Sequence, residues 1–248
     1  MKLNTREWGT GDRIAVLVHG IMSDSRTWRR VGPALADRGY RVVGVDLRGH
    51  GESARAEEYP LAADGADIME TLTGLDLDTV DLAIGHSLGA RAVLLAIEAG
   101  WRPARAAYVD PAWRIARPGR DFNPSAFIDF ADHATREQIA EMCPRWDAED
   151  VEVELATLAL WDRHTALDLP KQTAAALEAG TAGDGTGLPL SPKVPSLVML
   201  ADDSQMVDAQ DAETLRGRGF ELRTVPGAGH SIHRDDFDGF MTALDGWI

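Results

Sequence analysis

Cysteine is nearly absent from this chain of 248 residues, which carries a single one, Cys143. One thiol cannot form an internal disulfide framework, and it excludes a zinc site built from cysteines. Long apolar runs are also missing, since no stretch approaches the ~18 consecutive apolar residues of a membrane span. The first residues, MKLNTREWGTGDR, lack the apolar run of a secretory signal. We therefore expect a cytoplasmic protein without a membrane partner.

Positive charge is scarce as well. Lys and Arg number 25 against 40 Asp and Glu, so the formal net charge is −15 at pH 7. Such a charge repels phosphate backbones and anionic lipid surfaces, and we expect no nucleic-acid partner. The partner that this composition favours is a neutral or cationic small molecule, and the sequence gives no indication of the oligomeric state.

Short runs rich in Val, Ile, Leu and Ala recur along the chain, and each is typical of a strand buried on both faces. They cover residues 13–20, 40–49, 79–87, 104–111, 195–202 and 220–227. Helical patterns fall at 27–38, about 60–74, 88–99, about 208–217 and 234–247. Because strand and helix alternate, the sequence predicts an α/β fold with a mostly parallel, doubly wound sheet.

The alternation breaks once, between Asp110 and Pro195. This stretch has helical periodicity in REQIAEMCPRW and VEVELATLALWDRH. We predict a core formed by residues 1–110 and 195–248, with residues 111–194 inserted as a helical cap. Three tryptophans of this stretch favour an enclosed apolar pocket for a small or medium substrate: Trp113, Trp146 and Trp161.

The stretch LAIGHSLGARAV joins a strand-like run to a helix-like run through Gly85-His86-Ser87-Leu88-Gly89. Gly-x-Ser-x-Gly in this position is the pattern of a nucleophile elbow, a turn so tight that the residues two before and two after the serine must be small. The helix that follows directs its N–H groups and its positive end at the same place. Ser87 is therefore the candidate nucleophile.

A serine needs a base at neutral pH. His230 follows the last predicted strand in VPGAGH, where Gly227 and Gly229 give the loop freedom, and it comes after Ser87 in the chain as this arrangement requires. His230 is the candidate base. His233 is the alternative, although its place beside Arg234 is more typical of a solvated helix start.

A negatively charged intermediate needs two N–H donors. The first candidate is the amide of Leu88, directly after the nucleophile. The second is the amide of Ile21, or less favourably Met22, in the loop after the strand AVLVHG. We interpret His19 and His86 as structural. Since His19, His50, His86 and His230 lie on separate loops without a ligand-like spacing, we expect no metal and no cofactor.

Four segments resemble the α/β-hydrolase fold family in order and spacing: LVHGIMSDSRTW, VVGVDLRGHGES, IGHSLGA and VPGAGHSIH. The resemblance covers the chain from about residue 13 to its end, apart from the insertion. It implies a triad of serine, acid and histidine and a helical cap over the site. It also implies that residues 46–51 form a structural loop beside the site.

The acid departs from the family pattern. Family members commonly carry it in Gly-x-x-Asp after the strand that precedes the histidine strand, and here that stretch is LADDSQMV, with Ser204 in the expected position. Asp202 and Asp203 precede this expected position by two residues and one residue. Asp110, which ends a buried strand 110 − 87 = 23 residues after the nucleophile, resembles an alternative position used by some small esterases. We prefer Asp110 and leave Asp202 and Asp203 open.

Together these residues predict a serine hydrolase of the carboxylesterase or lactonase type, acting on an ester or lactone through an acyl-enzyme. Serine at the elbow disfavours haloalkane dehalogenases and epoxide hydrolases, which need a carboxylate there. The fold hosts several other activities. Those left open are carbon–carbon bond hydrolysis, thioester hydrolysis, perhydrolysis, a hydroxynitrile lyase-like reaction and a non-catalytic small-molecule receptor.

Overall fold

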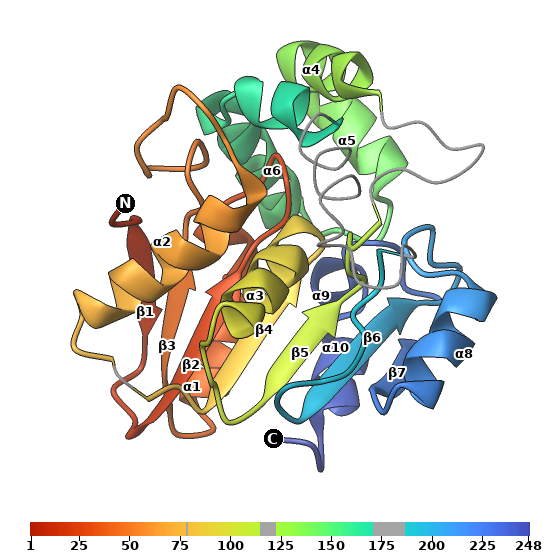
Figure 1. Ribbon diagram of the computed structural model, residues 1–248. Helices are drawn as coiled ribbons and strands as arrows, with labels where there is room; N and C mark the ends of the chain where they lie inside the picture. The colour runs from red at the N-terminus through yellow and green to blue at the C-terminus, as the bar shows by residue number, and fades with distance from the viewer. Residues whose placement is uncertain (78, 115–122, 171–186) are drawn as a thin grey trace.

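The computed structural model describes residues 1–77, 79–114, 123–170 and 187–248. Seven strands form one sheet in the order β1-β3-β2-β4-β5-β6-β7. The strands are β1 (Thr5–Trp8), β2 (Arg13–Val18), β3 (Tyr40–Val45), β4 (Leu82–His86), β5 (Ala106–Val109), β6 (Ser196–Ala201) and β7 (Glu221–Val225). All neighbouring pairs are parallel except β1 with β3. The predicted mostly parallel α/β sheet is confirmed (Figure 1).

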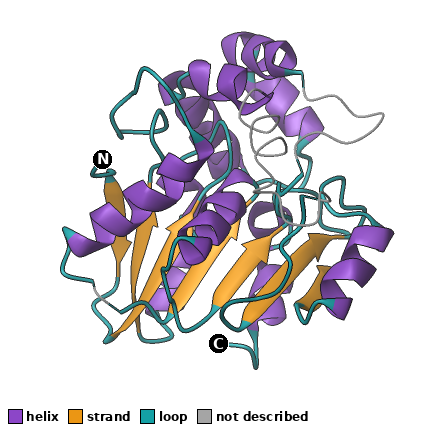
Figure 2. Ribbon diagram, viewed as in Figure 1, coloured by secondary structure: helices purple, strands orange, loops and turns teal. Residues whose placement is uncertain are grey.

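Helices cover both faces of this sheet (Figure 2). Alternate residues of β2 separate the two layers, because successive side chains of a strand point to opposite faces. Val16 and Val18 belong to one apolar cluster with α2 (Leu61–Thr73), α3 (Leu88–Glu98) and α8 (Ala209–Gly217). Ala15 and Leu17 belong to the other, with α1 (Val31–Ala36) and α10 (Phe237–Leu244). The sheet is therefore doubly wound, as predicted.

Two predicted helices are divided in the structure. The helix expected at 27–38 begins as the 3-10 helix η1 (Ser25–Trp28) and continues as α1. The helix expected at 234–247 consists of α9 (Ile232–Asp235) and α10, which meet at Asp236. The Asp236 carboxylate accepts the Gly239 amide at 2.9 Å and caps α10, which fixes the break.

The sequence patterns missed two elements. The short edge strand β1 is only partly buried, so its apolar alternation is weak. The helix α4 (Pro124–His133) has no fully buried residue, although Phe130 and Ala131 pack against the small apolar cluster around Ile139. Its start does carry a recognisable signal, since Asn123 caps the helix and Pro124 stands in its first turn.

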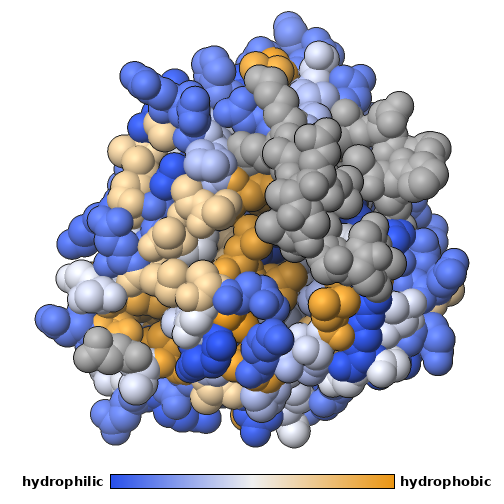
Figure 3. All heavy atoms as spheres, in the orientation of Figure 1, coloured by the Kyte–Doolittle hydropathy of each residue, from blue (hydrophilic) through white to orange (hydrophobic). Residues whose placement is uncertain are grey.

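Between β5 and β6, residues 164–170 are helical, and three helices precede them: α4, α5 (Arg136–Met142) and α6 (Ala148–Leu160). They lie over the carboxyl edge of the sheet (Figure 1). Residues 115–122 and 171–186 of the predicted cap lie outside the described residues, and the division into core and cap at 110 and 195 stays a prediction. On the face drawn in Figure 3, hydrophilic side chains cover most of the rim. The described helices include none long and apolar enough to cross a bilayer.

Candidate active site

Ser87 stands between β4 and α3 with φ 51° and ψ −112°. The flanking glycines leave no room for a side chain. A Cβ on Gly85 would lie 2.5 Å from the Gly89 carbonyl oxygen, and a Cβ on Gly89 would lie 2.3 Å from the Val18 carbonyl oxygen. The turn is thus as tight as the Gly-x-Ser-x-Gly pattern predicted, and β2 packs directly against the start of α3.

Left-handed backbone marks this edge of the sheet. In the described part of the chain four residues other than glycine have a positive φ, and three of them are here: Met22 at 60°, Ser87 at 51° and Asp110 at 39°. Each such conformation costs about 1–3 kcal/mol and persists where the surrounding structure enforces it, often at a functional site. Met22, Ser87 and Asp110 follow β2, β4 and β5, so the strain is concentrated where these three strands end.

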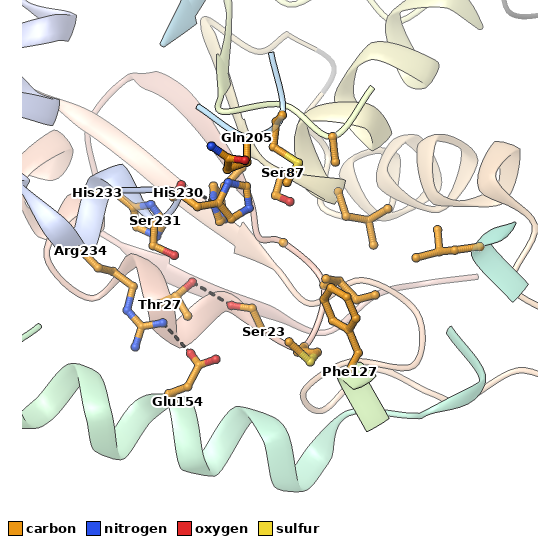
Figure 4. Close-up of a pocket in the computed structure, with 18 of the residues that line it drawn as sticks. Ser23, Thr27, Ser87, Phe127, Glu154, Gln205, His230, Ser231, His233 and Arg234 are labelled. Carbon is orange, nitrogen blue, oxygen red and sulfur yellow. Dashed lines mark hydrogen bonds and ion pairs between the residues drawn. The ribbon is translucent and has the colours of Figure 1, made fainter. Parts of the chain in front are cut away.

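Asp110 and His230 form a direct pair. His230 Nδ1 donates a hydrogen bond to Asp110 Oδ2 at 2.6 Å. Asp110 is fully buried, whereas 40% of the His230 side chain is exposed. Because Nδ1 is the donor, the neutral ring carries its free lone pair on Nε2. His230 and Ser87 line the same cavity, and both point into it in Figure 4.

The other two candidate acids lie elsewhere. Asp202 is exposed, and its Oδ2 accepts the Gly227 amide at 2.9 Å. Asp203 is also exposed. Within the described chain, no hydrogen bond joins either carboxylate to His230. Ser204 does reach the pair, since its Oγ donates to Asp110 Oδ1 at 2.5 Å. The sequence had no signal for this contact, because Ser204 stands out there only as the position that lacks a carboxylate.

The two predicted amide donors lie at the same cavity. Leu88 and Ile21 both line it. Leu88 opens α3, and the amides of a first helical turn have no partner within the helix. In the described structure no backbone hydrogen bond engages the Ile21 amide. Gly20 lets this loop approach closely, because a Cβ there would lie 3.2 Å from Ser87 Cβ.

Neighbouring histidines are buried and structural. His19 Nδ1 donates to the Gly20 carbonyl at 2.7 Å, and its Nε2 accepts the Leu47 amide at 2.9 Å, as the structural interpretation expected. His86 Nε2 donates to the His230 carbonyl oxygen at 3.0 Å and so holds the backbone of the histidine loop. Burial lowers the pKa of His86 well below its usual value, with further lowering by His230 and His233. His86 is therefore neutral at pH 7.

The prediction of a solvated His233 is wrong. This residue does lie in the short helix α9, but its side chain is 2% exposed and its ring stacks on Trp28 with centroids 4.2 Å apart. Burial lowers its pKa well below the usual value, and the positive charge of Arg234 adds to the effect. The sequence could not reveal this burial, because Trp28 is about 200 residues away in the chain.

The cavity has a volume of about 430 Å³. One part is apolar, with Phe127 of α4 among its walls, and another part is polar (Figure 4). In the polar part the Arg234 guanidinium, 4% exposed, donates to Glu154 Oε2 of α6 at 2.6 Å. Burial raises the pKa of Glu154, although Arg234 opposes the rise. The hydroxyls of Ser23, Thr27 and Ser231 line the same polar part.

Only one of the three tryptophans expected around a pocket lines this cavity. Trp146 does so, and its ring lies under the Arg234 guanidinium, 3.4 Å from ring centroid to Cζ. Trp113 instead packs against Tyr108 and Phe220. Trp161 is 1% exposed and donates to the Thr165 hydroxyl. Two of these three tryptophans therefore contribute to packing rather than to the cavity wall.

No group of three or more His, Cys, Asp or Glu side chains in the described regions has the arrangement of a metal site.

Comparison with known proteins gives concordant results. A family model described as "Alpha/beta hydrolase family" matches residues 15–243. The N-formylmaleamate deformylase of Pseudomonas putida is 29% identical over 97% of this chain and 90% of its own length. An esterase from Exiguobacterium antarcticum superposes with a TM-score of 0.76 at 18% identity, over 99% of this chain and 94% of that one. A solved N-formylmaleamic acid deformylase from Pseudomonas putida gives 0.76 at 24% identity, over 97% and 94%.

Proposed function

Because this chain belongs to the alpha/beta hydrolase family, we propose that it is a serine hydrolase acting on a carboxylic ester or lactone. In this proposal Ser87 is the nucleophile, His230 the general base and Asp110 the acid that orients the histidine. The substrate is small to medium in size and largely apolar, and the reaction passes through an acyl-enzyme.

One observation carries the proposal: the 2.6 Å hydrogen bond from His230 Nδ1 to the buried Asp110, at a cavity that the strained Ser87 also lines. A carboxylate on Nδ1 leaves Nε2 to take the Ser87 proton as Oγ attacks the acyl carbon. His230 then protonates the leaving alcohol. Water then attacks the acyl carbon while His230 takes its proton, and His230 passes this proton to Ser87 Oγ as the bond to the acyl group breaks and the carboxylic acid departs.

The amides of Leu88 and Ile21 are the proposed donors to the oxyanion. Charge develops on the carbonyl oxygen during attack, and fixed N–H groups stabilise it without having to reorganise. The position of Leu88 at the start of α3 adds the positive end of the helix.

The cavity supports a substrate with two unlike ends. Its apolar part accepts a short hydrocarbon group, and about 430 Å³ is the size of a small-molecule site rather than of a polymer groove. The Arg234 and Glu154 charges neutralise each other at 2.6 Å. The polar part therefore fits a neutral group that both donates and accepts hydrogen bonds, such as a hydroxyl or a carboxamide.

Hydrolysis of an N-formyl amide is the second candidate, and the deformylase relative, similar over 97% of this chain, is the observation that favours it. The same residues serve both reactions, because in each an acyl carbon is attacked and His230 protonates the leaving group. Carbon–carbon bond hydrolysis, thioester hydrolysis, perhydrolysis, a lyase reaction and non-catalytic binding are the remaining alternatives from the sequence.

The test is a substrate panel of p-nitrophenyl acetate, butyrate and octanoate together with p-nitroformanilide. The wild type is compared with Ser87→Ala, Asp110→Asn and the double variant Asp202→Asn/Asp203→Asn, each checked for a native melting transition. We expect the wild type to hydrolyse the short esters, Ser87→Ala and Asp110→Asn to lose about 10³-fold or more of kcat/KM, and the double variant to retain most activity.

Other results change the proposal in defined ways. Faster turnover of the anilide than of every ester makes the amide reaction the principal one. Loss of activity in the double variant but not in Asp110→Asn moves the acid to Asp202 or Asp203. If the wild type hydrolyses no compound of the panel, the hydrolase proposal is contradicted for these acyl groups, and a lyase reaction or non-catalytic binding is favoured.

A further inference from the structure

Ser204 lies in the loop between β6 and α8, at the position where the family pattern places a carboxylate. Its Oγ donates to Asp110 Oδ1 at 2.5 Å, on the opposite side of the carboxylate from His230. We propose that Ser204 is a positioning residue that fixes the Asp110 carboxylate for its contact with His230. This inference rests on the proposed function, in which Asp110 is the acid.

The direction of this hydrogen bond is determined by the surrounding backbone. Ser204 Oγ accepts the amides of Met206 at 3.1 Å and Val207 at 3.0 Å. A hydroxyl has two acceptor lone pairs and one hydrogen, so these two contacts fill the lone pairs. The hydrogen is left to point at Asp110. A donor to an ionised acceptor forms a stronger bond than a neutral pair, which favours this one geometry.

Without Ser204 the carboxylate would be poorly held. Oδ1 of Asp110 has one other protein donor in the described structure, the Ala201 amide at the long distance of 3.5 Å. Asp110 is fully buried, so bulk water is not in contact with it. Loss of the hydroxyl removes the shorter of the two contacts to Oδ1, so the carboxylate can turn more widely about its Cβ–Cγ bond while Oδ2 still faces His230 Nδ1.

The loop that contains Ser204 also contacts the segment that carries His230. Asp202 Oδ2 accepts the Gly227 amide at 2.9 Å, and its own amide donates to the Ala228 carbonyl at 3.1 Å. Residues 202–204 thus contact both the acid and the loop that carries His230. In the family pattern this loop carries the acid itself. In the present proposal it supports an acid, Asp110, that directly follows β5.

Charge gives a signature that a purely structural role would not produce. The hydroxyl withdraws electron density from the carboxylate, and its removal leaves more negative charge facing the imidazole. The protonated form of His230 is then stabilised. The acid limb of the kcat/KM profile should move to higher pH, because the base remains protonated over a wider range.

The experiment is a double-mutant cycle of wild type, Ser204→Ala, Asp110→Asn and the double variant, with Ser204→Thr to retain the hydroxyl. The control is Asp203→Asn, an exposed neighbour in the same loop. Each protein is assayed on the best ester of the panel across pH 5–9. The imidazole of His230 is titrated in parallel by NMR, which needs no turnover.

We expect Ser204→Ala to lower kcat about tenfold with KM nearly unchanged, since a hydrogen bond to a charged group has this strength. Its acid limb and its NMR titration midpoint should both move to higher pH. In the Asp110→Asn background the same substitution should change kcat less than twofold. Ser204→Thr should restore most of the activity, and Asp203→Asn should behave as wild type.

A tenfold loss that persists in the Asp110→Asn background overturns the inference, because Ser204 would then act through another group. An unchanged His230 titration in Ser204→Ala also overturns it, whether or not the protein turns over an ester. The proposed function fails differently, through a full-activity Asp110→Asn or Ser87→Ala protein or a silent wild type.

Discussion

At the scale of single residues, the nucleophile depends on the absence of side chains around it. Three glycines surround Ser87, and a Cβ on any of them would lie within 3.2 Å of another atom. At Gly85 and Gly89 the nearest atoms belong to backbone that cannot move aside cheaply. Since the left-handed φ of Ser87 is itself unfavourable, the packing of β2, β4 and α3 must supply the energy that maintains it.

Gly89→Ala should therefore be destabilising. The added methyl would lie 2.3 Å from the Val18 carbonyl oxygen and 2.4 Å from that of His19, and the start of α3 must shift away from β2. We expect a loss of about 1–3 kcal/mol in unfolding free energy, the usual cost of overpacking, and a loss of the ester hydrolysis proposed above. Urea denaturation measures the first and the ester assay the second.

The matched control is Gly74→Ala, at the end of α2, where φ is −70° and the new methyl has only ordinary contacts at 3.4 Å or more. It should be neutral or slightly stabilising, because alanine restricts the unfolded chain. Equal urea midpoints for the two variants would show that the elbow tolerates a side chain.

At the scale of elements, two arginines connect helix α6 to the rest of the protein: Arg29, which follows η1, and Arg234 of α9. Arg29 contacts the carboxylates of Asp147, Glu149 and Asp150 at 2.5, 2.9 and 3.0 Å. Arg234 contacts Glu154 of the same helix. Asp150 is only 1% exposed, so its charge depends on these cations, whereas Asp147 and Glu149 are exposed and contribute little. The position of α6, and with it the polar wall of the cavity, depends on them.

Arg29→Met should loosen α6 without unfolding the sheet. Removing the closer partner of buried Asp150 costs about 2 kcal/mol, and local opening of the helix should become roughly thirtyfold more frequent. Hydrogen exchange of the α6 amides measures this. The control is Arg41→Met, which removes the partly exposed contact to Glu7 on the sheet edge. Unchanged exchange in α6 would mean that apolar packing alone positions it.

At the scale of the whole molecule, neutral histidines are packed into a strongly acidic protein. His19, His50, His86 and His233 are all buried, and burial lowers the pKa of each. For His50 the pKa falls from 6.5 to about 3. Because the folded-state value lies below the unfolded one, unfolding takes up protons. The stability from neutral His50 is complete above pH 6.5 and is lost as pH falls towards 3.

His50→Gln should consequently weaken the acid sensitivity of folding. Between pH 6 and pH 4 the unfolding free energy of the wild type should fall more steeply than that of the variant, by up to about 1.4 kcal/mol per pH unit. Urea denaturation at several pH values gives both slopes, with pH 8 as reference because both side chains are neutral there. Parallel curves would contradict the assignment. Asp64, whose pKa burial raises to about 7, has the opposite effect on the pH dependence of stability. This effect is the same in the wild type and in His50→Gln, so it cancels when their slopes are compared.

Local pattern determined much of this protein. Buried strands are apolar on both faces, helices that cover a sheet have one apolar side, and a tight turn requires glycine, so the strand order in the chain and the elbow at Ser87 could be predicted from neighbouring residues alone. The matched family and the parallel sheet confirm that interpretation of the fold. The edge strand β1 was missed because it is only partly buried and lacks such a pattern, and α4, a helix without a fully buried residue, was missed as well.

What only the tertiary structure decided are the contacts between segments far apart in sequence. Asp110 and His230 are 120 positions apart, and Asp110 and Ser204 are 94 apart. The sequence favoured Asp110 only through a resemblance to some small esterases and left Asp202 and Asp203 open, because each of them also follows a buried strand; the sheet places Asp110 beside the imidazole. The burial of His233 against Trp28 and the pairing of Arg234 with Glu154 likewise arise from packing. Sequence sets which groups are available, and the order of strands in the sheet sets which of them meet.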